Sequence, residues 1–405
     1  MKYDLTIMGL GYIGLPMAVV SAETGLRVLG VDIRPDIVAT VNAGRVHIEE
    51  PGLPEKLAPV VASGQLRAAV KPEPSHIFMI AVPTPVDHHT HRPDMAMVES
   101  AALAVAEVIE AGDLVILQST SPVGATEHNV KAVIEKKRPR LSGKLEYVYC
   151  PERAIPGKTM HEMIYNDRAV GGLSPSATKR GVAFYKRMVK GELLETDAAT
   201  AEMVKLVENA SRDVQIAFAN ELSLACDAMG LNVWEVIKLA NHHPRVNILQ
   251  PGPGVGGHCI AVDPWFIIDA APEQTPLMRT ARNVNDGKPD WVVAQVKKAA
   301  EGLTNPTICL LGLAYKENVD DFRESPSVTV ADKLIAAQLG KVMVVEPFMT
   351  SSSKYHLVPL EEGLGQADIV VHLTAHDVFK KIASASLRAK KVIDARGSLS
   401  FSLSP

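Results

Sequence analysis

The chain has 405 residues, of which 47% are hydrophobic and 22% are charged, and its formal net charge is −4. This composition is typical of a globular protein, and the length predicts roughly two to four domains. A slightly acidic chain without a long basic run argues against nucleic acid as a partner. No apolar stretch reaches the ~18–20 residues of a membrane helix, and the four cysteines show no C-x-x-C spacing. We therefore expect a cytoplasmic protein that has no signal peptide and no membrane contact.

A glycine-rich turn separates the first predicted strand from the first predicted helix. The strand covers Leu5–Met8, the turn reads Gly9-Leu-Gly11-Tyr-Ile-Gly14, and the helical pattern runs to about Thr24. In a dinucleotide-binding unit, Gly9 would allow the tight turn and Gly11 would let the backbone approach a pyrophosphate. Gly14 would let the helix pack closely on the sheet. The alternative is a glycine-rich turn in an unrelated α/β fold.

An acidic residue ends the second predicted strand, Arg27–Asp32. Asp32 would accept hydrogen bonds from ribose hydroxyls, and its charge would repel a 2′-phosphate. The motif therefore favours NAD over NADP. Arg34 points the other way, because an arginine at this place could pair with a 2′-phosphate.

Strands and helices continue to alternate through the N-terminal third. The predicted strands are His76–Val82, Leu114–Leu117 and Glu146–Tyr149, and a helix is predicted for Met95–Glu110. Thr84, Thr120 and Glu152 each follow one of these strands, at the sheet edge where open parallel sheets bind ligands. Glu152 is the acid best placed to act as a general base. The alternative for Glu152 is a surface ion pair with a basic neighbour.

A histidine-rich segment, Asp87-His88-His89-Thr-His91, has the composition of a metal cluster. It lies in a polar loop that lacks glycine-fixed geometry and any pattern of supporting partners. We therefore expect a solvated loop and no metal site.

One long helix is predicted for Thr196–Met229, with Asp197 and Thr200 as candidate N-terminal caps and Gly230 as the stop. Further helices are predicted for Val233–Ala240, Leu277–Asp286 and Trp291–Ala300. Since strands are missing from this pattern, the segment is expected to form a separate helical connector.

Polar residues recur on one face of the long helix. Lys205, Asn209 and Arg212 stand at i, i+4 and i+7, so they share a stripe. The stripe is either a solvated face or a set of donors directed at a ligand. The stripe with Phe218 and Cys226 is either core or a dimer surface.

Residues 249–266 read L-Q-P-G-P-G-V-G-G-H-C-I-A-V-D-P-W-F. Glycine lets backbone approach a ligand closely. A helix that begins near His258 would place Cys259 and Asp263 on one face and the thiol at the helix N-terminus, where the dipole favours thiolate. The segment therefore describes an activated nucleophile beside a ligand-binding loop. The alternative is a buried and inert cysteine.

Strand–helix alternation returns after Asn305-Pro306, without a second G-x-G-x-x-G motif. The predicted strands are Thr307–Leu311, Lys341–Glu346, Ile369–Leu373 and Lys391–Asp394, and the predicted helix is Ser325–Gln338. Lys316, Arg323 and Arg396 lie at strand ends or just beyond them, where they would suit phosphate groups. The alternative is three solvated cations.

These motifs together resemble the UDP-glucose/GDP-mannose dehydrogenase family over essentially the whole chain. The matching segments are GLGYIGLP at 9–16, VPTP at 82–85, STSPVG at 119–124, CPER at 150–153, Lys205 with Asn209, GPGVGGHC at 252–259 with Asp263-Pro264, and GLAYK…DDFRESP at 312–326. Within the family, residues 200–209, 218–224 and 243–266 look most like the bacterial UDP-N-acetyl-D-mannosamine 6-dehydrogenase branch. Ala261, where a proline is common elsewhere in the family, looks like the same branch.

The resemblance implies an α/β fold with two Rossmann-like doubly wound domains, joined by a helical central domain with one long helix. We place the NAD-binding domain at 1–195 and the UDP-sugar-binding domain at 304–405. The central domain, at 196–303, would carry the catalytic lysine, the cysteine loop and the dimerisation surface. A homodimer is implied, in which His243 and Arg245 complete the substrate site of the other subunit.

The implied reaction is a four-electron oxidation with two NAD⁺, from a C6 alcohol through an aldehyde to an acid, for surface polysaccharide synthesis. Cys259 would hold the aldehyde as a thiohemiacetal and then as a thioester, which water near Glu152 and Asp263 would hydrolyse. The implied catalytic residues are Cys259, Lys205, Asn209, Asp263, Glu152 and Thr120. The implied cofactor contacts are Gly9, Gly11, Tyr12, Ile13, Gly14, Asp32, Thr84, Thr120 and Arg323. The implied substrate contacts are Arg153, Ala154, Lys205, Asn209, Arg212, His243, Arg245, Gly254, Gly256, Tyr315, Lys316 and Arg396.

The leading substrate from the branch resemblance is UDP-N-acetyl-D-mannosamine. The alternatives are the same chemistry on UDP-glucose or UDP-N-acetylglucosamine, a two-electron hydroxyacid or polyol dehydrogenase that needs no cysteine, and a catalytically silent nucleotide-binding protein. The silent protein is disfavoured because Glu152, Lys205, Asn209, Cys259 and Asp263 are all present.

Overall fold

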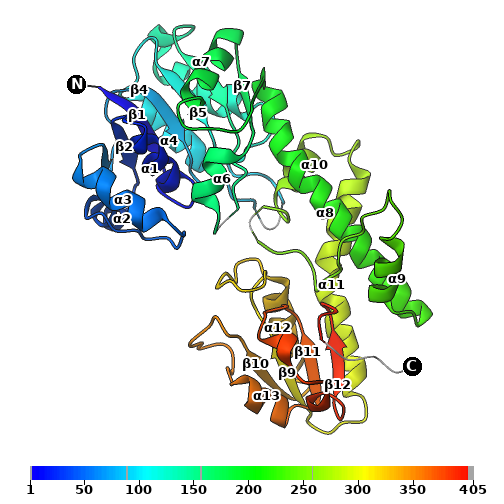
Figure 1. Cartoon of the computed structure of the whole chain (residues 1–405). Coiled ribbons are helices and arrows are strands. Elements are labelled where there is room, and N and C mark those ends of the chain that lie inside the picture. Colours follow the sequence, from blue (N-terminus) through cyan, green and yellow to red (C-terminus); the bar gives the residue numbers. More distant parts are fainter. Residues whose placement is uncertain (1, 88–89, 156, 258, 400–405) are drawn as a thin grey trace. The chain divides into compact units, whose positions relative to one another are not determined.

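The structure is a computed structural model that describes residues 2–87, 90–155, 157–257 and 259–399. The chain forms two compact units (Figure 1). The first unit consists of Met1–Glu208 with Trp265–Ala271, and the second consists of Asn209–Pro264 with Pro272–Pro405. Helix α8 (Ala198–Met229) contributes residues to both units.

The first unit contains an eight-stranded sheet in the order β3-β2-β1-β4-β5-β6-β7-β8. Its strands are β1 (Tyr3–Met8), β2 (Val28–Val31), β3 (Leu66–Ala69), β4 (Ser75–Ile80), β5 (Leu114–Leu117), β6 (Glu146–Tyr149), β7 (Arg168–Gly172) and β8 (Leu193–Asp197). Neighbouring strands are parallel except β6 and β7, which are antiparallel. The strand order reverses direction between β1 and β4, so the crevice for a nucleotide is expected at their carboxyl ends.

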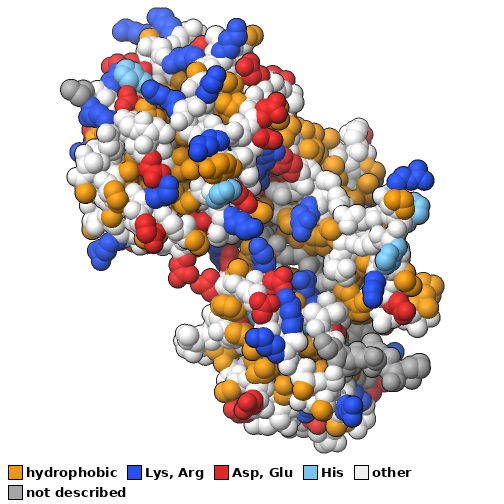
Figure 2. Space-filling view, in the orientation of Figure 1, with side chains coloured by type: hydrophobic (Ala, Val, Ile, Leu, Met, Phe, Trp, Pro, Cys, Tyr) orange, Lys and Arg blue, Asp and Glu red, His pale blue; other side chains and the backbone are white. Residues whose placement is uncertain are grey.

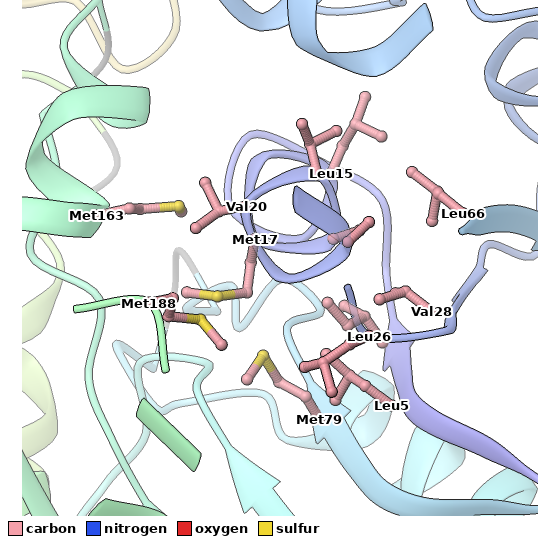
Figure 3. Packing of buried hydrophobic residues seen from close by; sticks show 14 of the residues in the cluster. Leu5, Leu15, Met17, Val20, Leu26, Val28, Leu66, Met79, Met163 and Met188 are labelled. Atoms are coloured by element: carbon pink, nitrogen blue, oxygen red, sulfur yellow. The ribbon is translucent and has the colours of Figure 1, made fainter. Parts of the chain in front are cut away.

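Helices cover both faces of this sheet. They are α1 (Gly14–Glu23), α2 (Pro35–Asn42), α3 (Leu53–Ala62), α4 (Ala96–Ala106), the π-helical turn η1 (Thr126–Lys131), α5 (Ala132–Lys137), α6 (Thr159–Tyr165) and α7 (Pro175–Tyr185). Because side chains alternate along a strand, Leu5 and Ile7 of β1 join one hydrophobic cluster and Met8 joins another. Figure 3 shows Met17 and Val20 of α1 beside Met163 and Met188 in the first of these clusters. The predicted doubly wound α/β arrangement is confirmed for this unit.

The second unit combines helices with a four-stranded parallel sheet in the order β10-β9-β11-β12. The strands are β9 (Thr307–Leu311), β10 (Lys341–Val345), β11 (Ile369–His372) and β12 (Lys391–Asp394). The helices are α9 (Val233–Ala240), α11 (Pro276–Ala300), α12 (Pro326–Ala337) and α13 (Leu360–Gln366). Helix α10 (Asp263–Ala270) begins just after the cysteine loop (252–259), and from Trp265 onward its residues belong to the first unit. The predicted second α/β element and the long helix are therefore both present.

Helix α8 begins two residues later than predicted, because Thr196 and Asp197 belong to β8. Asp197 is the predicted cap: its Oδ1 accepts a hydrogen bond from the backbone N of Thr200 at 2.9 Å, and its Oδ2 accepts one from the Thr200 hydroxyl at 2.7 Å. A carboxylate at this place satisfies a backbone donor that the first helical turn leaves unpaired.

The two helices predicted between Leu277 and Ala300 form the single helix α11, which contains Pro289. Proline has no N–H for the carbonyl four residues earlier, which is that of Asn285. The helix nevertheless continues, because Val292, Val293 and Val296 beyond the proline are buried in the core of the second unit.

Among the residues that the structure describes, there is no helix with the length and apolar character that a membrane span requires. On the face drawn in Figure 2, Lys and Arg side chains are interspersed with Asp and Glu side chains. This mixed surface agrees with the small net charge of −4.

Candidate functional site

The glycine-rich turn connects β1 to α1, at the strand-order reversal of the first unit. Gly9 has φ +93°, a backbone conformation that favours glycine. A Cβ atom on Gly14 would lie 1.8 Å from the carbonyl oxygen of Gly9, whereas a Cβ atom on Gly11 would have no neighbour within 4 Å. Gly14 is thus required by the packing of the protein itself, and the space at Gly11 fits the close approach of a pyrophosphate.

This difference separates two variants of the turn. Gly14→Ala is expected to cost at least about 2–3 kcal/mol of stability, because the added methyl group overlaps backbone that cannot move away. Gly11→Ala is expected to change stability by less than about 0.5 kcal/mol and to weaken NAD⁺ binding instead. Urea unfolding without cofactor and calorimetric titration with NAD⁺ measure the two effects. Equal loss of stability in both variants would contradict this account of the turn.

Asp32, at the end of β2, faces the same turn. Its Oδ2 accepts a hydrogen bond from the backbone N of Leu10 at 3.1 Å, and its Oδ1 accepts one from the backbone N of Arg34 at 3.0 Å. The Arg34 guanidinium does not turn toward Asp32 but pairs with the exposed Asp36. This ion pair lowers the pKa of Asp36. With Arg34 occupied in this way, the carboxylate of Asp32 fits NAD better than NADP. Tyr12, inside the turn, and Ile33, directly after Asp32, are both exposed.

The loops that carry Thr84 and Thr120 are tied together at the same sheet edge. The hydroxyl of Ser119, which follows β5, donates a hydrogen bond to the carbonyl of Val82, which follows β4, at 2.7 Å. Glu202 of α8 accepts hydrogen bonds from the backbone N of Gly124 at 2.5 Å and of Thr126 at 2.8 Å. Glu202 therefore fixes the loop after Thr120 to the helix that carries Lys205.

Glu152 is buried, and its carboxylate accepts four hydrogen bonds. Oε1 accepts them from the backbone N of Arg153 and of Ala154, both at 2.9 Å. Oε2 accepts them from Gln118 Nε2 at 3.2 Å and Arg168 Nη2 at 2.9 Å. A carboxylate offers about four acceptor positions, so one of these bonds would have to break before Glu152 could take a proton from water. The predicted alternative of a surface ion pair is wrong, because the pair with Arg168 is buried.

Arg168 was not singled out by the sequence, although it is only 2% exposed. Its Nη2 also donates to the carbonyl of Met163 at 3.0 Å, and its guanidinium lies 5.3 Å from the ring centroid of Tyr185. Burial raises the pKa of the neighbouring Cys150 thiol, against the opposing charge of Arg168. The available signal was an arginine at the start of the otherwise apolar strand Arg-Ala-Val-Gly-Gly.

Cys259 is exposed and lies in the turn before α10. The prediction of a helix that begins near His258 is wrong for the described residues, since α10 begins at Asp263, and His258 itself lies outside them. The carbonyl of Cys259 accepts hydrogen bonds from the backbone N of Val262 at 3.1 Å and of Asp263 at 2.9 Å. Cys259 therefore lies in the turn that leads into α10, four residues before the first residue of the helix, and is not part of the helix itself.

Asp263 pairs directly with Asn209. The Asn209 side-chain amide donates a hydrogen bond to Asp263 Oδ2 at 2.5 Å, across 54 positions of sequence. Asn209, Cys259 and Asp263 all belong to the second unit, whereas Lys205, Glu152 and Thr120 belong to the first.

The glycines before Cys259 lie against the segment that follows β9. A Cβ atom on Gly256 would lie 2.6 Å from the carbonyl oxygen of Glu324 and 2.8 Å from Tyr315 Cβ. Gly257 has φ +82°, and its Cβ atom would lie 2.9 Å from the Tyr315 ring. The loop therefore needs glycine for close backbone approach, and the structure brings the predicted residues Gly254, Gly256 and Tyr315 to one place.

Predicted cations of the second unit differ in their surroundings. Arg396 Nη1 would lie 2.8 Å from a Cβ atom on Gly252, so this guanidinium is at the start of the glycine loop. Arg323 pairs with Asp321 at 2.7 Å, and Lys316 and Arg212 are exposed.

His243 and Arg245 are exposed after α9, where His243 Nδ1 accepts a hydrogen bond from the Arg245 backbone N at 3.3 Å. In the first unit, Arg153 pairs with Glu208 at 2.6 Å.

The sheet of the second unit repeats the acid–turn contact of the first. Glu346, just after β10, accepts hydrogen bonds from the backbone N of Leu313 at 2.6 Å and of Ala314 at 3.1 Å. The buried His376 Nε2 lies 3.3 Å from the same carboxylate. Burial opposes ionisation of Glu346, but the hydrogen bonds from His376 and the backbone outweigh it and lower the pKa. The turn after β9 is thus closed by protein groups, which agrees with a different ligand grip in this unit.

The histidine-rich segment carries no metal cluster within the part of the chain that the structure describes. His88 and His89 lie outside the described residues. The ring of His91 stacks on Trp265 with a centroid distance of 4.1 Å.

Similarity to known proteins extends over nearly all of the chain. Residues 3–189 match the NAD binding domain of the UDP-glucose/GDP-mannose dehydrogenase family, residues 199–287 its central domain and residues 309–400 its UDP binding domain. An NDP-N-acetyl-D-galactosaminuronic acid dehydrogenase of Ralstonia nicotianae is 49% identical over 97% of this chain and 95% of its own length. A UDP-N-acetyl-D-mannosamine dehydrogenase of Yersinia pestis is 48% identical over 97% of this chain and 98% of its own length.

A solved structure agrees with these relatives. The UDP-N-acetyl-mannosamine dehydrogenase from S. aureus is 39% identical, with a TM-score of 0.89 over 98% of this chain and 96% of the other. The sheet topology, the nucleotide turn and the glycine–cysteine loop described above are therefore accompanied by similarity along the full sequence. The chain belongs to the UDP-glucose/GDP-mannose dehydrogenase family and is an NAD-dependent nucleotide-sugar dehydrogenase.

Proposed function

We propose that the protein oxidises UDP-N-acetyl-D-mannosamine at C6 to UDP-N-acetyl-D-mannosaminuronate, in two steps that use two NAD⁺, for surface polysaccharide synthesis. The observation that carries the proposal is the exposed Cys259 at the end of a glycine loop that lies against Tyr315, in the unit that contains the UDP binding domain. Asp263, at the start of the next helix, pairs with Asn209 of α8. Relatives named as UDP-N-acetyl-D-mannosamine dehydrogenases support this choice of sugar.

The first step converts the C6 alcohol to an aldehyde. When bound, NAD⁺ supplies the hydride acceptor for each of the two oxidations. We propose that a water molecule held by Asp263 accepts the proton of the C6 hydroxyl group. Asp263 also orients Asn209, whose side-chain amide donates a hydrogen bond to it. Lys205 is assigned to stabilise the negative charge that develops on oxygen.

The second step uses Cys259 as the nucleophile. Its sulfur forms a bond to the aldehyde carbon, and the carbonyl oxygen takes up the proton to give a thiohemiacetal. Loss of a second hydride from carbon and of the proton from the hydroxyl group yields a thioester, and water then breaks the C–S bond to release the acid and the thiol. Covalent capture prevents the reactive aldehyde from escaping between the two oxidations.

A second copy of the chain is the proposed partner. Large apolar side chains are exposed on and beside α8 and α9, among them Phe218 at 57%, Met229 at 62% and Leu239 at 62%. Exposed large apolar side chains that gather on one surface mark protein–protein interfaces, so these residues are the candidates for the surface of the dimer. We infer a homodimer in which His243 and Arg245, exposed after α9, reach the substrate of the other subunit.

A second sugar is favoured by a specific observation, since the Ralstonia relative is named for N-acetyl-D-galactosaminuronic acid. The experiment is a panel of UDP-N-acetylmannosamine, UDP-N-acetylgalactosamine, UDP-N-acetylglucosamine and UDP-glucose, with NADH yield and kcat/KM measured for each. We expect two NADH per sugar and a preference of about 10–200-fold for the first compound, the range that one substituent can provide.

Preference for another UDP-hexose would contradict the assigned sugar while the family chemistry stands. A yield of one NADH per sugar would contradict the four-electron reaction and favour a two-electron dehydrogenase. The mass of the same preparation in solution checks the homodimer, which a monomer at micromolar concentration would contradict.

A further inference from the structure

A buried chain of polar side chains connects α8 and α11 in the second unit. Arg282 Nη1 donates to Asp213 Oδ1 at 2.6 Å, and the side-chain amide of Asn285 donates to the same oxygen at 2.8 Å. The Asn220 amide donates to Asn285 Oδ1 at 2.8 Å. All four side chains are at most 2% exposed. None of them belongs to the sites predicted from the sequence.

The chain of hydrogen bonds ends on the cysteine loop. The backbone N of Gly252 donates to Asn220 Oδ1 at 2.8 Å. The bonds therefore all run in one direction, from Gly252 through Asn220 and Asn285 to the ionised Asp213–Arg282 pair. Hydrogen bonds arranged in series polarise one another in a low-dielectric interior, so each amide has a single orientation that satisfies its neighbours.

Asn285 also reaches the loop directly, through its backbone carbonyl. Pro289 has no N–H to donate to the carbonyl of Asn285. A Cβ atom on Gly254, two residues after Gly252, would lie 3.2 Å from that carbonyl oxygen, 2.8 Å from Pro326 and 3.4 Å from Pro289. The first half of the loop thus packs against α11 at the turn where Pro289 leaves the Asn285 carbonyl without its helical N–H donor. Gly254 has φ +141° at this place.

The second half of the loop rests on Tyr315 through Gly256 and Gly257, as described above. Contacts therefore recur at residues 252, 254, 256 and 257, and Cys259 follows two residues later. The backbone that leads to the thiol is thus held in both halves of the loop, by Asn220 and Asn285 at its start and by Tyr315 closer to the thiol.

Helix packing alone does not call for these groups. Well-packed apolar side chains stabilise a helix interface at least as well as buried polar ones, which must give up their hydration. A neighbouring polar contact of the same helices makes the comparison: Lys288 Nζ donates to Ser223 Oγ at 2.8 Å, and Ser223 donates to the carbonyl of Asn220 at 2.6 Å. Within the residues that the structure describes, Ser223 makes no hydrogen bond to the loop, whereas Asn220 accepts one directly from the backbone N of Gly252.

We propose that Asn220, supported by Asn285 and the Asp213–Arg282 pair, is a positioning residue that sets the place of Cys259 for attack on the aldehyde. The proposal rests on the proposed function of Cys259. It concerns the second oxidation, because only that step needs the thiol.

The test compares Asn220→Ala with Ser223→Ala, since both remove a buried hydrogen bond of α8 and both are expected to lower the melting temperature. In Asn220→Ala, the rate of the second oxidation is expected to fall at least about tenfold, the cost of one misplaced reacting group. The rate of the first oxidation is expected to stay within about threefold of the wild type. Free aldehyde is expected to leave the enzyme, where added semicarbazide traps it for measurement. Ser223→Ala is expected to keep both rates within about threefold, because its lost bond does not reach the loop.

Alkylation of Cys259 by iodoacetamide provides a readout without turnover. Its rate is expected to change at least about threefold in Asn220→Ala and to stay constant in Ser223→Ala. If the alanine variant does not fold, Asn220→Ser replaces it, because its hydroxyl is one bond shorter and is expected not to reach Gly252. An unchanged ratio of the two oxidation rates in the folded variant, or the same change in Ser223→Ala, would overturn the proposal. The wild type serves as the separate check on the proposed function, which fails if it yields one NADH per sugar.

Discussion

Cys259→Ser is expected to lower steady-state formation of the acid by about 10³-fold or more, the scale of losing a catalytic nucleophile. A serine hydroxyl is a weak nucleophile at its ordinary pKa, whereas a cysteine thiol is partly ionised near neutral pH and intrinsically reactive. The structure leaves Cys259 exposed in a turn where an incoming carbonyl carbon can reach it. Rapid-quench measurement of aldehyde, thioester and NADH separates the two oxidations.

Cys309→Ala is the matched control for this variant. Cys309 lies in β9, where burial raises the pKa of its thiol to about 12, so it cannot serve as a nucleophile near neutral pH. We expect Cys309→Ala to keep the yield of two NADH per sugar, with some loss of stability from the cavity it leaves. If Cys259→Ser or Cys259→Ala formed the acid at the wild-type rate, the covalent mechanism would be wrong.

Arg168→Met is expected to destabilise the protein by about 3–5 kcal/mol, the usual cost of removing one partner from a buried ion pair. The variant would leave the Glu152 carboxylate buried with Gln118 as its remaining side-chain donor among the described residues. It would also disturb the turn at Arg153 and Ala154, whose backbone N–H groups that carboxylate holds. Urea unfolding measures the stability, and initial rates measure the consequence for activity.

A double-mutant cycle supplies the control. Glu152→Gln removes the charge that Arg168 neutralises, so the double variant is expected to be more stable than Arg168→Met alone, by about 1–3 kcal/mol. Additive losses from the two single variants would show that Arg168 and Glu152 do not act as a pair. A loss below about 1 kcal/mol in Arg168→Met would place the pair in the weak class of surface ion pairs.

Local patterns explain which parts of the fold could be predicted. The glycine turn between Gly9 and Gly14 depends on backbone geometry over a few residues, and Asp32 follows at the end of the next strand, so the pattern was readable. The long α8 follows from an uninterrupted run of helix-forming residues that starts at the cap Asp197. In contrast, β3, β7 and β8 were missed. β3 and β8 are the edge strands of the sheet, and β8 is largely solvated, with leucine and glutamate residues that also suit a helix.

In the candidate site too, local patterns revealed some residues, whereas contacts between distant segments could not be predicted. Glycine spacing around Cys259 marked the loop, but the start of α10 at Asp263 depends on how the turn is hydrogen-bonded. Glu152 was found from its place after a strand, while its partner Arg168 had no motif. Glu202 and Asn220 were not found either, because their contacts with Gly124 and Gly252 cross 78 and 32 positions of the chain.

By itself, the sequence determined the α/β class, the nucleotide turn with Asp32, the long helix and the loop that ends at Cys259, because each depends on neighbours a few residues apart. Only the tertiary structure decided how those residues are held. The Glu152 carboxylate accepts hydrogen bonds from four donors. The cysteine loop is hydrogen-bonded to Asn220 through the backbone N of Gly252 and packs against Tyr315. The physical reason is that burial makes every unpaired polar group costly, and the partner that satisfies it is chosen by packing between distant segments, which no local pattern records.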